Sequence, residues 1–582
     1  MTMRHFFLPL AVGVVSTCAW AQQYTISTFA GNTTAGFSGD GGAATSAELS
    51  SPDGLTFDSS GNLYIADSAN QRVRKISSGT ISTVAGNGTA GYSGDKASGV
   101  TGTATDAEML GPSGVSFDSS GNLYIADTGN HVIRMVTSAG IISTIAGDNT
   151  GGYAGDGAAA TLAELEFPGA TAVDSSGNIY IADSGNAAIR EIIAGTINTL
   201  FGPGNGSLLF DPESLLLDGQ GNLYVCDGDG LRVLKFNLTT KVETVVAGNG
   251  NDGFSGDYGP ATDAELSDPR SIALDSKGNL YIADTNNQRI RKVYPDGTIA
   301  TIAGFGLPGY FGDGGPASNA LLSAPHGVAV DASGNVYVSD TENNVIRLLT
   351  PVSPSITSGG VVNAASFTAQ VSPGSLATIF GKNFTGTLLS AGASLPLPAS
   401  LGGISVTVNG KTAPVLYVNT SQINFQIPWE TSTGTAAIVV SSGGIASPAV
   451  NVTVVAAAPG LFVQGSHAIV QNFPDFSLNS SGNPAKVGST IIAYFTGGGK
   501  VSPAVADGAA AGDNPVSTVV SSVTATIGGQ SATVSSASLA PGFVGLWQAN
   551  ITVPTVATAG DYPLILSAEG QSSAAANVSV TP

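Results

Sequence analysis

Aspartates recur at fixed positions through the first 350 residues, and carboxylates at such spacing could form a ring of metal ligands or a set of catalytic acids and bases. The stretch DSSGNLYIAD at 58–67 returns unchanged at 118–127, and related stretches begin at 174, 218, 275 and 331. In five of the six copies, an arginine stands seven residues after the last aspartate of the stretch. The aspartates are Asp67, Asp127, Asp183, Asp227, Asp284 and Asp340, and the arginines are Arg74, Arg134, Arg190, Arg291 and Arg347.

The pattern of these aspartates and arginines favours a structural role over a ligand ring. A carboxylate and a guanidinium at constant separation can pair and hold a loop, and residues identical in every repeat usually serve the repeat. In the fourth copy Leu234 replaces the arginine and Gly230 replaces an asparagine, whereas Asp227 is kept. The loop and the arginine therefore change together, as expected of one structural unit.

A second set of carboxylates lies in glycine-rich segments such as GFSGDGGAATSAEL at 36–49, which precede five of the six copies. These segments could bind calcium through their carboxylates, or a sugar through carboxylates and nearby tyrosines. The alternative is that each Gly-Asp makes a turn and the apolar end of the segment packs on the repeat. The aspartates are Asp40, Asp95, Asp156, Asp257 and Asp313, and the tyrosines are Tyr92, Tyr153 and Tyr310.

The positions that differ between copies are the better candidates for specific chemistry. A proline precedes each first strand, and the residue after it varies: Asp53, Ser113, Gly169, Glu213, Arg270 and His326. In an enzyme, His326 could act as a base oriented by Asp53, with Glu213 beside them and Arg270 binding an anion or oxyanion. In a binding protein, the same four residues would form a polar rim that contacts a ligand. No residue is predicted to be catalytic under that second interpretation.

The elements that must position these residues follow from the repeat itself, whose spacings are 60, 56, 44, 57 and 56 residues. Within one unit, GLTFD, LYIAD, RVRKI and ISTVAG predict four short strands joined by glycine-rich turns, which is typical of a β-propeller blade. The sixth unit ends after its third strand, and YTISTFAG at 24–31 resembles the missing fourth strand. We therefore expect an all-β fold with six blades at 22–350, closed by the N-terminal strand, with the variable residues around the mouth of the central channel.

The repeat pattern P-x-G-V-x-x-D-x-x-G-N-L-Y-I-A-D resembles the NHL repeat family, and the glycine-rich segments resemble those of teneurin-like and bacterial secreted NHL proteins. The resemblance implies a six-bladed propeller that acts mostly as a binding platform. A related propeller, the peptidyl-amidating lyase, is a zinc enzyme. Beyond the leader, this chain has only three histidines, and one of them lies outside the repeats, so a three-histidine zinc site in the propeller is excluded. They are His131, His326 and His467.

After the Pro/Ser linker TPVSPS at 350–355, the pattern changes to alternating apolar and polar residues, as in ISVTVNG and ANVSVTP. This alternation predicts two immunoglobulin-like sandwiches, at 351–457 and 458–582. Stretches such as PGSLATIFG and LYVNTSQINFQIPWE resemble an uncharacterised C-terminal region of secreted acidobacterial proteins. We expect these modules to serve as spacers or attachment points.

Composition and charge limit the partners and the compartment. The formal charge is −21, which disfavours nucleic-acid binding. A basic start, an apolar run and AWA at 19–21 predict a cleavable signal peptide over 1–21, and no later stretch predicts a membrane span. Beyond it only Cys226 remains, so no internal disulfide can form, and this residue is expected to be small and buried.

The sequence thus predicts a secreted or cell-envelope recognition protein. Its propeller would bind an extracellular polysaccharide, peptide or partner protein on the loop-rich face, with no cofactor other than calcium. The alternative is a propeller lyase or hydrolase that acts at the channel mouth.

Overall fold

The computed structural model describes residues 24–95, 102–203, 209–384, 389–390, 395–443, 445–556 and 558–582. It divides into two compact units, 23–352 and 353–582, and each is treated separately. The predicted signal peptide at 1–21 lies outside the described residues. Within the described part of the chain, no helix has the length and apolar character needed to cross a bilayer.

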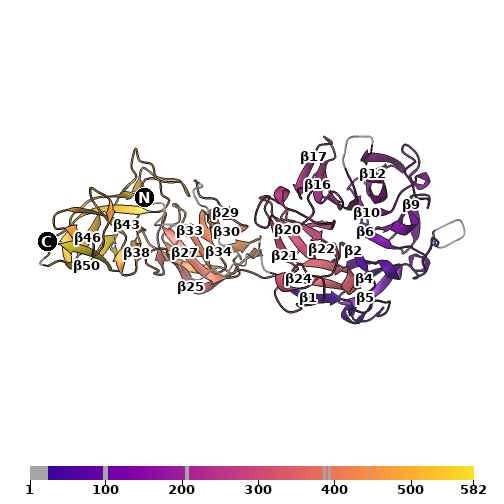
Figure 1. Cartoon of the computed structure of the whole chain (residues 1–582), viewed down its shortest axis with the longest axis horizontal. Helices are drawn as coiled ribbons and strands as arrows, with labels where there is room; N and C mark the ends of the chain where they lie inside the picture. The colour runs from indigo at the N-terminus through magenta and orange to yellow at the C-terminus, as the bar shows by residue number, and fades with distance from the viewer. Residues whose placement is uncertain are drawn as a thin grey trace. The chain divides into compact units, whose positions relative to one another are not determined.

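The described residues of the first unit form six antiparallel four-stranded sheets arranged as the blades of a propeller (Figure 1). The strands β2, β6, β10 and β22 lie toward the centre of the ring, and β5, β9 and β17 lie at its outside. The prediction of an all-β, six-bladed propeller is therefore confirmed. Blades one to three are β2 (Pro52–Phe57), β3 (Leu63–Asp67), β4 (Arg72–Ser77) and β5 (Thr80–Ala85); β6 (Pro112–Phe117), β7 (Leu123–Asp127), β8 (Val132–Val136) and β9 (Ile142–Ala146); and β10 (Pro168–Val173), β11 (Ile179–Asp183), β12 (Ala188–Ile193) and β13 (Thr196–Phe201).

Blades four to six continue the same order. They are β14 (Pro212–Leu217), β15 (Asn222–Asp227), β16 (Arg232–Asn237) and β17 (Glu243–Ala247); β18 (Pro269–Leu274), β19 (Leu280–Asp284), β20 (Arg289–Val293) and β21 (Ile299–Ala303); and β22 (Pro325–Val330), β23 (Val336–Asp340), β24 (Val345–Pro351) and β1 (Tyr24–Ala30). The N-terminal strand β1 pairs with β24, from Tyr24 opposite Pro351 to Ala30 opposite Ile346. The first strand of the chain thus completes the last blade, as predicted.

The DSSGN segment forms the turn between the first two strands of each blade. In blade one, Asp58 accepts hydrogen bonds from the backbone N–H groups of Ser60 (3.0 Å) and Asn62 (2.9 Å) and from the Asn62 side chain (2.8 Å). Gly61 adopts a φ of +80°, which glycine tolerates better than other residues. The following LYIAD strand is buried along its whole length. The turn residues therefore serve the hairpin.

Successive inner strands approach each other closely around the channel. A Cβ atom on Gly54 would lie 2.3 Å from the carbonyl oxygen of Ser113, and one on Gly327 would lie 2.2 Å from that of Asp53. Such contacts cannot be accommodated by a larger residue without moving the backbone. In blades one, two and six, which have this glycine, its lack of a side chain therefore allows the close approach of neighbouring inner strands.

The five glycine-rich segments, which we call inserts, lie against the outer strand of the blade that they precede. In blade one, Gly41 donates its N–H to the carbonyl of Ile81 on β5 (2.8 Å), and Ile81 donates to the carbonyl of Gly42 (3.1 Å). Short 3-10 turns follow, such as η2 (Ala44–Ser46). The inserts are 36–49, 91–109, 152–165, 253–266 and 309–322, before blades one, two, three, five and six.

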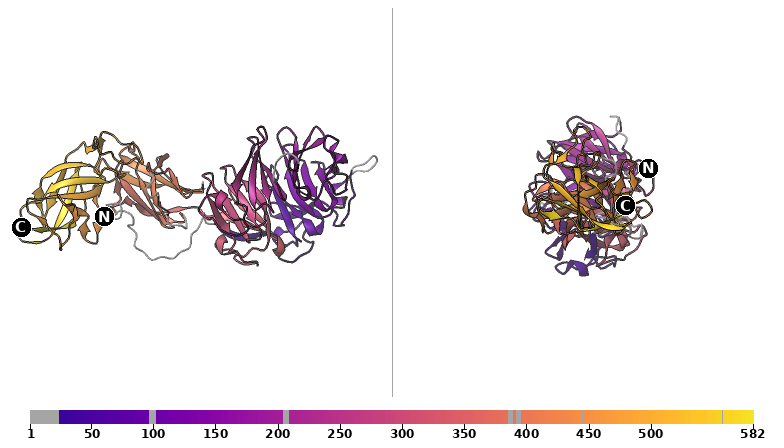
Figure 2. Two further views of the ribbon diagram at one scale, coloured as in Figure 1. Left: turned by 45° about the horizontal axis from the view of Figure 1, so that its top comes forward. Right: turned by 90° about the vertical axis from the view of Figure 1, so that its left-hand side faces the viewer.

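The second unit contains two pairs of sheets, each around its own apolar cluster (Figure 2). The first pair packs residues such as Phe425 and Ile438 between its sheets, and the second packs Trp547 and Leu564. The first pair is β25 (Ser355–Asn363), β27 (Leu376–Lys382), β33 (Gln422–Gln426), β32 (Val415–Val418) and β28 (Leu389–Ser390), facing β26 (Gln370–Val371), β36 (Val450–Val454), β34 (Gly434–Ser442), β30 (Ile404–Val408) and β29 (Ser400–Leu401), with β31 (Lys411–Ala413) and β35 (Ile445–Ala446) at its side.

The second pair is built in the same way from shorter strands. One sheet holds β41 (Ser477–Leu478), β40 (Val470–Asn472), β43 (Thr490–Thr496), β49 (Trp547–Thr552), β48 (Val534–Leu539), β45 (Thr518–Val519), β44 (Val501–Ser502) and β37 (Gly460–Leu461). The other holds β38 (Val463–Gln464), β39 (His467–Ala468), β52 (Ala576–Thr581), β50 (Gly560–Ala568), β46 (Val523–Ile527), β47 (Gln530–Ala532), β42 (Ala485–Lys486) and β51 (Gln571–Ser572).

Candidate functional site

The aspartate that ends each LYIAD strand is buried and fully engaged by its own blade. In blade one, Asp67 accepts hydrogen bonds from the Ser50 N–H (2.8 Å), the Asn70 side chain (2.9 Å) and the Arg74 guanidinium (3.0 Å). Neither Asp67 nor Arg74 has a solvent-exposed side chain. Burial raises the pKa of Asp67, and it raises that of the equivalent Asp340 to about 6.

The arginine bridges this aspartate to the insert. In blade one, the second guanidinium nitrogen of Arg74 lies 2.7 Å from Asp40 and also donates to the carbonyl of Ser38 (3.1 Å). The other four arginines lie 2.7–2.8 Å from the insert aspartate and 3.0–3.2 Å from the strand aspartate. Each arginine thus pairs with two carboxylates, which supports the structural interpretation of Asp67, Asp127, Asp183, Asp284, Asp340, Arg74, Arg134, Arg190, Arg291 and Arg347.

The same pairing bears on the calcium prediction. In each insert, one carboxylate oxygen of the aspartate pairs with a buried arginine. These aspartates are Asp40, Asp95, Asp156, Asp257 and Asp313. Among the described residues, no group of three or more histidine, cysteine or acidic side chains gathers as a metal site. The calcium prediction for these residues stays a prediction without support from the geometry.

The tyrosines of the inserts also contact the blade. The rings of Tyr92, Tyr153 and Tyr310 lie 4.9–5.2 Å from the guanidinium carbons of Arg134, Arg190 and Arg347. Their hydroxyl groups lie within hydrogen-bonding distance of threonines on the outer strand, at 2.7–2.9 Å. These contacts hold the insert against the blade and leave 37–43% of each tyrosine exposed. The predicted role of the tyrosines in ligand binding stays untested.

Blade four replaces this network with a smaller one. Asp227 accepts from the N–H groups of Phe210 and Asp211 (2.9 and 3.0 Å) and pairs with Arg232, whose Nε lies 3.2 Å away. Gly230 stands where the other blades have asparagine, and a Cβ there would lie 2.1 Å from the Asp227 carboxylate. Arg232 was not predicted from the sequence, because it lies two positions before Leu234, which occupies the position of the arginine in the other blades.

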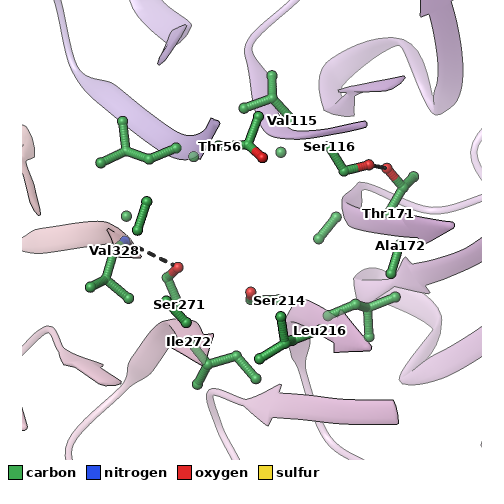
Figure 3. A pocket seen from close by; sticks show the side chains of 18 of the residues that line it. Thr56, Val115, Ser116, Thr171, Ala172, Ser214, Leu216, Ser271, Ile272 and Val328 are labelled. Atoms are coloured by element: carbon green, nitrogen blue, oxygen red, sulfur yellow. Dashed lines mark hydrogen bonds between the residues drawn. The ribbon is translucent and has the colours of Figure 1, made fainter. Parts of the chain in front are cut away.

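The variable residues do surround one end of the central channel. The channel has a volume of about 380 Å³, and Asp53, Glu213 and Arg270 line it together with residues of all six inner strands. Both hydroxyl groups and aliphatic side chains line the wall (Figure 3), where Ser116 contacts Thr171 at 2.7 Å. We call the end lined by Asp53, Glu213 and Arg270 the channel mouth.

The four predicted residues lie in two facing pairs at the channel mouth. His326 Nδ1 lies 3.6 Å from the Asp53 carboxylate, and Arg270 lies 3.6 Å from Glu213. Arg270 also donates from Nε to Asp268 (3.0 Å). All four side chains are partly buried, with 20–36% of each exposed. The mouth is therefore concave and acidic.

Burial raises the pKa of Glu213, and two further carboxylates at the mouth, those of Asp211 and Asp268, raise it more. Burial is the largest cause, and the neighbouring Asp211 carboxylate adds to it, so the pKa of Glu213 lies at about 8. Burial and the charge of Asp229 raise the pKa of Asp211 as well. Asp211 and Asp268 were not predicted from the sequence, although both immediately precede the proline of their blade, and an acidic residue beside the variable position was a usable signal.

A further set of residues, which the sequence patterns did not single out, forms hydrogen bonds between neighbouring blades. The residue after each strand aspartate donates its hydroxyl to the proline carbonyl of the next blade, as Thr341 does to Pro52 (2.8 Å). In blade four that residue is Gly228, and Cys226 donates from Sγ to Pro269 instead (3.1 Å). Cys226 is fully buried, as predicted, and burial raises its pKa. The other donors are Ser68, Thr128, Ser184 and Thr285.

The remaining histidines make contacts of other kinds. His131 accepts a hydrogen bond at Nδ1 from the N–H of Phe167 (3.2 Å) and lies against the ring of Phe167. His467 belongs to the second unit, where its Nε2 lies 3.0 Å from Asp561.

Comparisons with known proteins agree with the repeat and with the domain that follows it. Residues 78–153 and 214–306 match the teneurin NHL domain, residues 49–76 and 322–347 match the NHL repeat, and residues 360–454 match the IPT/TIG domain. The predicted NHL-type propeller, its teneurin-like character and an immunoglobulin-like domain after it are thereby confirmed.

Curated relatives of the chain include two proteins that it matches over part of its length. The chain is 29% identical over 274 residues to Protein SUPPRESSOR OF QUENCHING 1, chloroplastic, of Arabidopsis thaliana, which covers 43% of this chain and 26% of that protein. It is 31% identical over 276 residues to teneurin-4 of Mus musculus, which covers 40% of this chain and 10% of that protein. The chain thus spans about a quarter or less of the length of these relatives.

Solved structures that resemble the chain include an auxiliary nutrient binding protein from Bacteroides thetaiotaomicron, with 16% identity, a TM-score of 0.43 and coverage of 56% of this chain and 76% of that chain. They also include a virginiamycin B lyase from Staphylococcus aureus, with 16% identity, a TM-score of 0.32 and coverage of 51% of this chain and 80% of that chain.

Proposed function

Because the chain carries an NHL-repeat propeller like that of teneurins, followed by an IPT/TIG domain, we propose that it is a secreted recognition or adhesion protein. Its propeller binds a polysaccharide, a peptide or a partner protein at the channel mouth, and the sandwiches serve as spacer or attachment. The observation that carries the proposal is that the non-repeated residues converge at this mouth, whereas the repeated carboxylates and arginines are engaged by the fold.

The charge of the mouth limits the ligand. Carboxylates of Asp53, Asp211, Glu213 and Asp268 lie around a single arginine, Arg270. An acidic concave site repels anions and accepts hydrogen bonds from hydroxyl and amine groups. The ligand is therefore a neutral or cationic group, such as a sugar unit or an amine-bearing side chain.

The test is retention of ligands by the mature chain, residues 22–582, on arrays of extracellular glycans and surface proteins. We expect retention that weakens at least tenfold in an Asp53→Ala, Glu213→Ala variant. An Asp252→Asn variant, which removes an exposed carboxylate that does not line the channel, should retain the same ligands. Absence of specific retention, or retention unaffected by the double substitution, would refute binding at the mouth.

A second candidate, a lyase or hydrolase acting at the mouth, rests on one specific observation. With a pKa of about 8, Glu213 carries a proton near neutral pH and could donate it to a leaving group, while His326 faces Asp53 as a base. Turnover of any retained ligand, abolished by both His326→Ala and Glu213→Gln, would establish the enzyme. Retention without turnover would leave the recognition protein.

A further inference from the structure

The connection that leads into blade six, from Gly304 to Leu322, differs in character from the four other connections that contain an insert. At four positions where the others carry polar side chains, with the single exception of Ala154, it carries an apolar one. Residues that depart from a repeat in one blade alone are candidates for a task specific to that blade. The four residues are Phe305, Leu307, Phe311 and Leu321, and the same positions of blade one hold Asn32, Thr34, Ser38 and Glu48.

The polar residues at these positions serve their own connection. In blade one, the Asn32 side chain accepts the N–H of Thr34 (2.9 Å), and the Ser38 hydroxyl accepts the N–H of Glu48 (3.2 Å). Both contacts recur in blade five. The phenyl rings of blade six cannot accept either hydrogen bond. The apolar residues therefore replace side chains that hold the connection in shape, so their presence is not explained by the fold of the connection.

The apolar side chains are exposed and lie close together. Phe305 is 58% exposed, Leu307 is 57% exposed and Phe311 is 66% exposed. The N–H of Phe305 donates to the carbonyl of Ala320 (2.8 Å), and the N–H of Leu321 donates to the carbonyl of Phe311 (3.2 Å). Residues 305–311 thus run beside residues 320–321. We call Phe305, Leu307, Phe311 and Leu321 the blade-six patch, and an exposed apolar group of this kind marks an interaction site.

The charge around the patch limits what can cover it. The connection carries one charged residue, Asp313, which pairs with Arg347 (2.7 Å), whereas the other four connections carry two to four charged residues each. The whole chain has a formal charge of −21, and only six of its 41 acidic residues lie beyond residue 354. Two copies of the propeller therefore repel each other over most of their surface. The blade-six patch is a place where they can meet without that repulsion.

We propose that the blade-six patch is a self-association surface, which packs against the same patch of a second copy of this chain about a two-fold axis. A patch without net charge is complementary to itself, whereas an anionic lipid surface would be repelled by the acidic propeller. The exposed side chains supply on the order of 300 Å² per copy, less than the roughly 800 Å² per partner of a standard interface. The dimer is therefore weak and reversible, with a dissociation constant on the order of 10 µM.

Self-association through this patch has a consequence for recognition. None of the patch residues lines the central channel, so each copy in the dimer keeps its own channel mouth. A ligand with repeated units would then be held by two mouths at once, which raises the overall affinity without any new contact. The consequence rests on the proposed function, whereas the self-association surface itself does not depend on what the mouth binds.

The test is sedimentation velocity of the mature chain, residues 22–582, at concentrations from about 1 to about 300 µM. We expect the sedimentation coefficient of the parent to rise with concentration toward that of a dimer. The triple variant Phe305→Asn, Leu307→Thr, Phe311→Ser carries the residues of blade one, and its dissociation constant should rise at least tenfold. Its thermal transition should equal or exceed that of the parent, because the hydrogen bonds of the connection return. A monomeric parent, or unchanged association in the variant, would overturn the proposal.

A matched control comes from the insert of blade three. Leu162 is 69% exposed, and aspartate stands at the same position in blades two and five. Leu162→Asp thus removes an equally exposed apolar side chain and should leave the association unchanged. Equal weakening by this substitution and by the triple variant would refute a specific role of the patch.

A lipid surface is the other occupant that the experiment distinguishes. The probe is vesicles of phosphatidylcholine, which carry no net charge. A parent that stays monomeric but binds these vesicles, with the binding lost in the triple variant, would assign the patch to a membrane surface and overturn self-association. A parent that dimerises and does not bind the vesicles supports the proposal.

Discussion

Blade four and the other five blades use the same strand positions for different purposes. Where an insert is present, the asparagine, arginine and threonine around it form one connected network; where the insert is missing, Gly230, Leu234 and Val245 stand at those positions. Asp227 is kept because it accepts from backbone N–H groups of the strand entry, which every blade needs. Residues that recur in a repeat thus serve two separable tasks, and the irregular blade shows which residue serves which.

The test with the largest expected effect replaces Arg291 of blade five by leucine, the residue that blade four has at the equivalent position 234. Arg291→Leu leaves the carboxylates of Asp284 and Asp257 without their guanidinium, and removing one partner of a buried ion pair costs about 3–5 kcal/mol. We expect the thermal transition of the propeller to fall markedly in differential scanning calorimetry.

The matched control lies in blade four. Arg232 pairs with Asp227, and 20% of its side chain is exposed. Arg232→Ala leaves one carboxylate without a guanidinium where Arg291→Leu leaves two, so it should cost less than Arg291→Leu. Equal losses from the two substitutions would contradict the view that the five-blade network is the stronger one.

The second test concerns pH. Glu213 of blade four has its pKa raised to about 8, chiefly by burial and then by Asp211, whereas in the unfolded chain a glutamate titrates near 4.3. The folded state therefore holds a proton that the unfolded state releases, and stability falls as the pH rises from about 4.5 to about 8.

In the Glu213→Gln variant, the decrease in the free energy of unfolding between low and high pH should be about 1–3 kcal/mol smaller than in the parent protein. The measurement is chemical denaturation of both proteins at pH 5 and pH 8.5. A fall of the same size in the variant would show that Glu213 does not hold the proton.

The third test addresses the contacts between blades. Thr341 donates its hydroxyl to Pro52 across the closure of the ring, and Thr341→Val should cost about 1 kcal/mol because a buried carbonyl loses its donor. In blade four, Gly228→Ser restores a hydroxyl where Cys226 already donates to Pro269. That substitution should change stability by no more than about 0.5 kcal/mol in the same denaturation assay, and a clear gain would mean that the thiol is not an effective donor.

Much of the fold followed from the sequence because short-range patterns determine it. Alternating strands, glycine turns and a displaced fourth strand predicted six blades and their closure. The variable residue after the proline of each blade predicted Asp53 and Glu213 at the channel mouth, and both line the channel. Arg232 could not be predicted, since its approach to Asp227 depends on the loop shape that Gly230 permits. The raised pKa of Glu213 was also out of reach, because it depends on burial and on Asp211. The repeat therefore predicted the positions of side chains, and three-dimensional packing determined their chemistry.

The test with the smallest expected effect asks whether a tyrosine of an insert holds the insert against its blade or binds the ligand. Tyr153 lies against Arg190 with its ring and within 2.9 Å of Thr199 with its hydroxyl, and 43% of the residue is exposed. Tyr153→Phe keeps the ring and removes one partly exposed hydrogen bond, so stability should fall by about 0.5 kcal/mol or less. Retention of ligands on the arrays should not change, because the tyrosine serves the insert. Blade four offers the comparison, since Phe210 lies near Arg232 without a hydroxyl to lose. Reduced retention with unchanged stability would instead assign Tyr153 to the ligand, as the sequence analysis had predicted.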